Sequence, residues 1–188
     1  MKKHILPALI LTVVFILICG GLYPLLIAVI SKFAPGGGKG ETLMVNGKIV
    51  GYANEGQKFT VDKYFWSRPS AVGYNAAGSG GSNKAPSDSA YLKGVQAAID
   101  TFLVHNPTVK KEEIPSDLVT ASGSGLDPDI SVQGALVQVN RVAKVRNLVP
   151  EQVLALVNSH IQKPLLGLLG PEKVNVLKLN IALDELKK

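Results

Sequence analysis

The sequence predicts an α+β protein with one N-terminal transmembrane helix, followed by a single soluble domain with a small β-sheet and packed helices. The first observation is an uncharged apolar run near the N-terminus, long enough to cross a bilayer. The second is an Asn-Gly turn between short strand-like segments, and the third is a set of later stretches with apolar residues at helical spacing. We expect a membrane anchor over residues 1–33, a glycine-rich tether over 34–42 and the α+β domain over 43–188.

The anchor is the run from Ile5 to Ile30, which has no Asp, Glu, Lys, Arg or His and has Leu, Ile, Val or Phe at 17 of its 26 positions. A hydrocarbon core about 30 Å thick needs about 20 such residues in a helix. A cleaved signal peptide has a shorter apolar core and small residues before its cut, but the first such site here, 33–35, would place proline directly after the cut. Cys19 follows the large Ile18, which argues against a lipoprotein signal. We therefore predict an uncleaved transmembrane helix over about 5–30.

Three small or helix-bending residues interrupt this span: Gly20, Gly21 and Pro24. Adjacent glycines let another helix approach closely, and a proline frees a backbone carbonyl and can bend the helix. We predict that they pack against larger membrane partners, although glycine and proline are also common in membrane helices without such a role. One helix cannot enclose a transport pathway, so any pathway would belong to a partner.

Charge and composition exclude several classes of function. The net charge is +6, but basic and acidic residues are interspersed without a basic stripe, which argues against nucleic acid as a partner. The three histidines lack the spacing of a metal site and the only cysteine lies in the span, so we expect no metal. Lys2 and Lys3 before the helix, against Lys32 and Lys39 after it, lean slightly towards a cytoplasmic N-terminus and an extracytoplasmic domain.

The tether and the start of the domain are rich in turns. The Gly-Lys at 38–39 is not a phosphate loop, because Phe33 and Gly40 stand where that motif needs glycine and Ser or Thr. Residues 43–52 predict a β-hairpin around Asn46-Gly47, and a further strand is expected over 59–65. Residues 65–83, here called the aromatic loop, combine many glycines and serines with Trp and Tyr, which indicates an ordered loop over a surface.

The second half predicts alternating helices and short strands. We expect a helix from a cap at Ser87 or Ser89 to His105, a strand ending near Thr120, and a helix over 132–146 capped by Ser131. Further expectations are a helix over 151–161 after Pro150, a strand over 174–179 and a last helix capped by Asn180. Arg146 is expected to pair with an Asp of the preceding loop.

Residues 121–131 form a glycine-rich loop that runs into the helix at Ser131. Such a loop can direct backbone N–H groups at an anion. We favour the alternative, a turn in which Asp127 and Asp129 satisfy those donors, because two carboxylates would repel a phosphate.

Several long motifs resemble one family. They are Tyr64-Phe65-Trp66-Ser67-Arg68-Pro69-Ser70 with the Gly-Ser stretch after it, Ser122-Gly123-Ser124-Gly125-Leu126-Asp127-Pro128-Asp129-Ile130-Ser131, Gln138-Val139 with Arg141-Val142-Ala143, and Val174-Asn175-Val176-Leu177 with Leu179-Asn180. In this order behind a membrane helix, they resemble the C subunit of the bacterial Kdp-type potassium-transporting P-type ATPase over essentially the whole chain. Val132 departs from the family, in which proline is expected at that position.

The resemblance implies a non-catalytic accessory subunit of a high-affinity potassium uptake complex. Implied partners are a channel-like potassium-selective subunit, a P-type ATPase subunit, a small membrane peptide and the lipid bilayer of the bacterial plasma membrane. The family is described as a catalytic chaperone that raises the ATP affinity of the pump subunit, which by position implies a nucleotide contact at Gln138 with Ser122, Gly123, Ser124 and Gly125. No cofactor is expected to bind firmly, and ATP is expected only through the partner ATPase subunit.

A domain on the extracytoplasmic side of the membrane cannot reach cytoplasmic ATP. We therefore favour a role in stabilising the complex and bordering the mouth of the potassium pathway. The expected partner contacts in the aromatic loop are Trp66, Arg68, Tyr74 and Asn75. Two alternatives remain open: a membrane-tethered hydrolase using Ser124 and Asp127, and an extracytoplasmic binding domain unrelated to transport.

Overall fold

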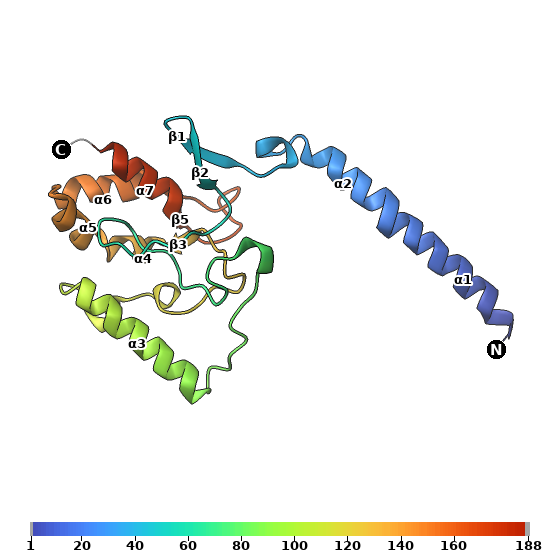
Figure 1. Cartoon of the computed structure of the whole chain (residues 1–188), viewed down its shortest axis with the longest axis horizontal. Coiled ribbons are helices and arrows are strands. Elements are labelled where there is room, and N and C mark those ends of the chain that lie inside the picture. The colour runs from blue at the N-terminus through green and yellow to red at the C-terminus, as the bar shows by residue number, and fades with distance from the viewer. Residues whose placement is uncertain (1, 187–188) are drawn as a thin grey trace. The chain divides into compact units, whose positions relative to one another are not determined.

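The computed structural model describes residues 2–186 and divides the chain into two compact units, residues 1–42 and 43–188. Figure 1 shows the long apolar helix of the first unit and the mixed helices and short strands of the second. The α+β class with one N-terminal apolar helix is thereby confirmed.

The first unit is one helix interrupted by a π-helical turn. Helix α1 (Lys2–Leu17) continues through the π turn η1 (Ile18–Leu22) into α2 (Tyr23–Ser31). Within this turn the Tyr23 N–H donates to the Ile18 carbonyl, five residues back. Pro24, which cannot donate a backbone hydrogen bond, follows directly, so the wider turn falls at the Gly20-Gly21 pair. A short turn, η2 (Pro35–Gly38), follows in the tether, with positive φ angles at Gly36 and Gly37.

The second unit opens with the predicted hairpin. Strands β1 (Thr42–Val45) and β2 (Lys48–Tyr52) flank Asn46 and Gly47, whose φ angles are 50° and 76°. Two positive φ values define the turn that matches the twist of paired strands. The hairpin is therefore confirmed.

The strand expected over 59–65 is wrong, because the backbone there bonds to side chains rather than to another strand. Asn180 Oδ1 accepts from the Phe65 N–H at 2.9 Å, and Asn180 Nδ2 donates to the Phe65 carbonyl at 3.0 Å. The strand expected near Thr120 is also wrong: η5 (Ser116–Leu118) is a 3₁₀ turn, and Thr120 bonds back to the Ser116 carbonyl through both its N–H and its hydroxyl.

The central sheet is small and antiparallel, in the order β3-β5-β4. Its strands are β3 (Asp129–Ser131), β4 (Ile161–Gln162) and β5 (Lys173–Asn175). Val174 faces both Ile130 and Ile161 across the sheet and is fully buried. Strand β3 was not predicted, since three residues carry too little alternation to stand out from a loop.

The strand expected over 174–179 ends at Asn175, and the helix cap expected at Asn180 is also wrong. Asn175 itself accepts from the Lys178 N–H and caps α7 (Val176–Glu185). The apolar residues after Asn175 are buried at helical rather than alternating positions, so burial selects a helix. Asn180 lies inside that helix, where its side chain holds Phe65.

The remaining helices of this unit are α3 (Ser89–His105), α4 (Val132–Leu136), α5 (Val139–Arg146) and α6 (Pro150–Ser159). The cap of α3 is Asp88, whose carboxylate accepts two backbone N–H groups, and not Ser87 or Ser89. The Ser131 cap and the start at Pro150 are confirmed. Short 3₁₀ turns complete the list, η3 (Ala76–Gly78) and η4 (Lys111–Glu113).

The single helix expected over 132–146 is broken between α4 and α5. The Gln138 side chain donates to the Gly134 carbonyl at 2.9 Å, the acceptor that the Gln138 backbone would use in a continuous helix. The Gln138 N–H donates instead to the Ala135 carbonyl, three residues back. The side chain thus replaces one backbone bond and tightens the turn.

The core lies among the sheet and helices α3 to α7, and Phe65 of the segment 59–68 belongs to it. Phe65 is fully buried and Trp66 packs edge-on against Phe102 of α3. Arg146 does not pair with the preceding loop as expected; it reaches Asp184 of α7 at 2.6 Å. These contacts fix the backbone from which the aromatic loop departs.

Candidate functional site

The aromatic loop starts from a buried amide clamp. Gln138 has no exposed surface, and its Oε1 accepts from the Trp66 N–H at 2.7 Å. Its Nε2 donates to the Gly134 carbonyl at 2.9 Å and to the Trp66 carbonyl at 3.4 Å. A buried amide that meets both backbone groups of one residue fixes that residue as strand pairing would.

Arg141 extends the clamp below the Trp66 ring. Its guanidinium lies 4.7 Å from the ring centre and donates to Gln138 Oε1 at 2.6 Å and to the carbonyls of Asp62 and Tyr64 at 2.5 and 3.0 Å. Burial lowers the pKa of Arg141 to about 10, an effect that the Asp62 carboxylate partly opposes. The side chain therefore remains charged at neutral pH, and its burial is compensated by hydrogen bonds in the fork geometry of a guanidinium.

Two asparagines complete the polar interior. Asn106 accepts from Arg141 Nε at 3.0 Å and donates to the Phe102 carbonyl, which ties α5 to α3. Asn180 holds both backbone groups of Phe65 from α7. These buried polar groups are bonded to the chain's own backbone and to each other, so their arrangement positions Phe65 and Trp66 and offers no free acid, base or nucleophile.

The aromatic loop after Trp66 rests on residues 122–125 of the glycine-rich loop. The Ser122 N–H donates to the Pro69 carbonyl, Ser70 Oγ donates to the Gly125 carbonyl at 2.7 Å, and the Gly80 N–H donates to the Ser124 carbonyl at 2.9 Å. Tyr74, whose pKa is raised by burial, donates its hydroxyl to the Arg68 carbonyl at 2.6 Å. The two loops therefore form one surface.

Gly125 lies at a close approach between these loops. Its φ is +68°, and a Cβ there would lie 2.5 Å from Val72 and 2.8 Å from the Gly80 carbonyl oxygen. Only glycine fits that position without movement of the aromatic loop. Gly123, by contrast, has open space at the same point.

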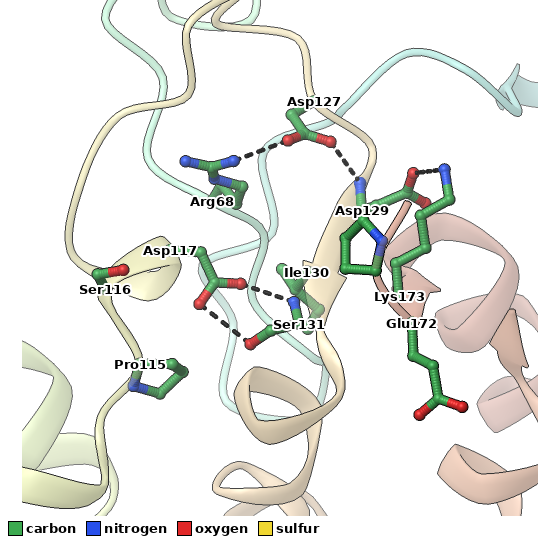
Figure 2. Close-up of a pocket in the computed structure, with 11 residues that line it drawn as sticks. Arg68, Pro115, Ser116, Asp117, Asp127, Asp129, Ile130, Ser131, Glu172 and Lys173 are labelled. Carbon is green, nitrogen blue, oxygen red and sulfur yellow. Dashed lines mark hydrogen bonds and ion pairs between the residues drawn. The ribbon is translucent and has the colours of Figure 1, made fainter. Parts of the chain in front are cut away.

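A cavity of about 520 Å³ adjoins this surface and is lined by acidic and basic side chains (Figure 2). Arg68 pairs with Asp127 at 2.8 Å, and Lys173 pairs with Asp129 at 2.5 Å. Asp117 accepts from the Ser131 N–H at 2.6 Å and from its hydroxyl, as Figure 2 shows.

The favoured alternative for the glycine-rich loop holds only in part, because oxygens of Pro69, Ser122 and Ser124 accept N–H groups of this loop. Asp127 accepts from the Asp129 N–H at 3.1 Å, whereas Asp129 itself pairs with Lys173. Asp117, which sequence reasoning did not consider, bonds the N–H at the start of α4. Over residues 2–186 the structure contains no group of three His, Cys, Asp or Glu side chains arranged for a metal ion.

The predicted site residues fall into separate environments. Gln138 bonds to the backbone of Trp66, whereas the loop 122–125 contacts the aromatic loop from Pro69 onward. Asn75 caps the short turn η3 at the surface. Gly20 and Gly21 have nothing of the chain within 4 Å of an added Cβ, so the helix surface beside them is open.

The clamp's other members were missed as site residues. Asn106, Asn180 and Asp62 come from parts of the chain far apart in sequence, and Asn180 was interpreted as a helix cap. A polar residue among the buried positions of a helix needs a partner, and this signal could have found Asn180. It does not apply to Asp62, which lies in an irregular segment.

These features define a class: a membrane-anchored α+β protein with one helix, Lys3–Ser31, long and apolar enough to cross a bilayer among the residues described. The chain belongs to the family described as "K+-transporting ATPase, c chain", whose model matches residues 5–185. It is therefore a subunit of a potassium-transporting ATPase, and the resemblance carried by its motifs is confirmed.

Relatives that share this family match the chain over nearly its whole length. A protein of Flavobacterium psychrophilum, named "Potassium-transporting ATPase KdpC subunit", is 60% identical over 185 residues, covering 98% of this chain and 100% of the relative. Proteins of the same name from Bacteroides fragilis and Caldanaerobacter subterraneus are 50% and 48% identical, covering 98% and 94% of this chain and 98% and 93% of their own lengths.

Proposed function

We propose that this subunit is non-catalytic and acts by stabilising the potassium pump, with its aromatic loop as the surface that contacts partner subunits. The observation that carries the proposal is the clamp: Gln138 and Arg141 are buried and spend their polar groups on the backbone of 62–66. Such a network presents Trp66 and the loop after it rigidly, which favours a docking role over a chemical one.

The hydrolase alternative finds little support. Ser124 Oγ accepts from the Leu126 N–H at 3.1 Å, and Asp127 pairs with Arg68. Among the hydrogen bonds of the described residues, none joins Ser124 to a histidine that could act as a base. ATP hydrolysis is accordingly proposed to lie with the P-type ATPase subunit, alongside a channel-like potassium-selective subunit and a small membrane peptide.

The nucleotide contact implied by the family stays a prediction. Gln138 has no exposed surface, and both ends of its amide are engaged. A ligand could reach it only if the loop moved away from the clamp. We therefore propose that Gln138 supports the pump through the position of Trp66, and not by touching ATP.

We further propose that the N-terminus is cytoplasmic and the domain extracytoplasmic, where the aromatic loop borders the mouth of the potassium pathway. The test is labelling of intact cells with a membrane-impermeant maleimide. Ala77→Cys, an exposed position of the loop, is placed in a Cys19→Ala background, and Lys3→Cys before the span is the matched control.

Position 77 should be labelled in intact cells and position 3 only after lysis. The opposite pattern would overturn the proposed orientation and make a nucleotide contact accessible. A domain that is outside but does not copurify with an ATPase in mild detergent would instead contradict the accessory role.

A further inference from the structure

The connection between β4 and β5 carries an exposed cluster of leucines in its middle. Residues 165–169, here called the leucine tip, have the sequence Leu-Leu-Gly-Leu-Leu, and their four leucines are 62–86% exposed. No charged residue occurs from Pro164 to Pro171. Isolated exposed leucines are ordinary, but four together on one turn mark a surface that contacts something apolar.

The backbone of the leucine tip is closed on itself. Leu165 and Leu169 bond each other through N–H and carbonyl in both directions, and the Gly167 and Leu168 N–H groups donate to Pro164 and Leu165. Four of the five N–H groups of the tip are therefore satisfied within the turn. A segment that leaves water for lipid must satisfy its polar backbone in this way, because lipid chains offer no partner.

The tip also keeps leucine where leucine is conformationally costly. Leu166 has a φ of +56°, a region that asparagine or glycine adopts more readily. The turn itself would be easier with either of those residues. The Leu166 side chain thus makes the surface of the tip apolar but does not favour the fold of the turn.

Lipid fits the composition of the tip better than a protein surface does. Protein interfaces concentrate their binding energy in Trp, Tyr and Arg, with leucine under-represented, and the tip has none of the three. Leucine partitions readily into hydrocarbon, and exposed Lys163 beside the tip suits anionic headgroups.

The tether limits how far the domain can move from its anchor. Ten residues separate the end of α2 at Ser31 from the start of β1 at Thr42, a length that spans at most about 40 Å when fully extended. A tethered surface of this kind meets the membrane at high effective concentration, so even a small apolar tip can engage it. The sheet behind the tip is fixed in the core by Val174.

We propose that the leucine tip inserts into the headgroup–acyl boundary of the bilayer and gives the domain a second, non-covalent membrane contact. This contact does not depend on which side of the membrane the domain occupies. It therefore stands or falls separately from the proposed orientation and from the accessory role.

The test uses the full chain, with Cys19→Ala, in vesicles of phosphatidylcholine and phosphatidylglycerol. An environment-sensitive fluorophore is attached at Leu168→Cys and, as the control, at Leu92→Cys, a leucine of α3 that is 51% exposed. We expect emission at shorter wavelength from position 168, and quenching by lipids that carry a spin label high on the acyl chain about twice as strong as at position 92.

Leu166→Asn, combined with the label at position 168, separates lipid contact from folding. Asparagine suits the positive φ, so thermal unfolding should stay the same or rise while the lipid quenching falls. Equal quenching at positions 168 and 92 would overturn the proposal. If position 168 were shielded only after partner subunits were added, the tip would be a protein contact and the lipid proposal would be wrong.

Discussion

Gln138 and Trp66 are joined through both polar groups of one peptide residue, with the Trp66 N–H 2.7 Å from Gln138 Oε1 and the Trp66 carbonyl 3.4 Å from Nε2. The two residues are 72 positions apart in the chain. The same amide also donates a hydrogen bond to the Gly134 carbonyl and so creates the break between α4 and α5. One side chain thus shapes a helix and positions the aromatic loop.

Removing this amide should unfold the domain more easily. In Gln138→Leu both backbone groups of Trp66 lose their buried partner, and we expect a loss of about 2–4 kcal/mol in the free energy of unfolding. Urea denaturation of the full chain in detergent, followed by Trp66 fluorescence, measures it. Gln133→Leu, on the exposed face of α4, is the control and should shift the midpoint little. Equal shifts would contradict the clamp.

Replacement of Arg141 even by lysine should destabilise the domain. Arg141→Lys keeps a charge but cannot reach Asn106, the Asp62 and Tyr64 carbonyls and Gln138 together, so we expect a loss of about 2–4 kcal/mol in the free energy of unfolding. The exposed Lys144 of the same helix provides the control Lys144→Met. Should both variants melt at the wild-type temperature, the fork of hydrogen bonds would have no energetic importance.

Gly125→Ala tests the contact between the two loops. Alanine must adopt a positive φ and its Cβ would meet Val72 and the Gly80 carbonyl, so we expect a loss of at least about 1 kcal/mol and faster proteolysis within residues 71–83. Gly123→Ala, two residues away and unobstructed, is the matched control. Identical proteolysis of both variants would show that the loops do not depend on each other.

Tyr74 should make stability decline in alkali. Burial raises its pKa above the ordinary value of 10, so the folded protein retains a proton that the unfolded chain loses. This contribution is fully present below pH 10 and is lost as pH rises through the folded pKa. In Tyr74→Phe the free energy of unfolding should fall by about 1 kcal/mol at pH 8, because the bond to the Arg68 carbonyl is lost, and should then decline less steeply above pH 10. Parallel pH profiles for the two proteins would refute this assignment.

The open helix surface at Gly20 and Gly21 should matter only in the assembled pump. Replacing both with leucine meets nothing within the chain, so we expect helix content to be unchanged or higher while recovery of the partner subunits in mild detergent falls several-fold. Ala28→Leu, elsewhere on the exposed span, is the control. Full recovery of partners with the double variant would remove these glycines from the interface.

Signals contained in a few neighbouring residues predicted their structure correctly. The span follows from length and lack of charge, the hairpin from Asn46-Gly47, and two helix starts from Ser131 and Pro150. Each is a preference of the local backbone or of a side chain in a bilayer, and needs no distant partner. The long motifs likewise sufficed to recognise the family.

Predictions failed where a distant side chain takes over backbone hydrogen bonds. The segment 59–65 has the pattern of a strand, but Asn180 bonds to the Phe65 backbone in place of a neighbouring strand. The pattern over 132–146 is that of one helix, but the Gln138 side chain bonds to Trp66 and the helix breaks there. Alternating and helical patterns over only six residues are too similar to separate a strand at 174–179 from the start of α7.

The sequence by itself determined that this chain is anchored in a membrane, carries one α+β domain and belongs to a potassium-pump family, since these depend on hydrophobic length, local turns and motif order. Only the tertiary structure decided that Gln138 and Arg141 are a buried support for Trp66 and that four leucines stand exposed on one turn. Both depend on which groups lose contact with water, and that is set by packing between residues far apart in the chain.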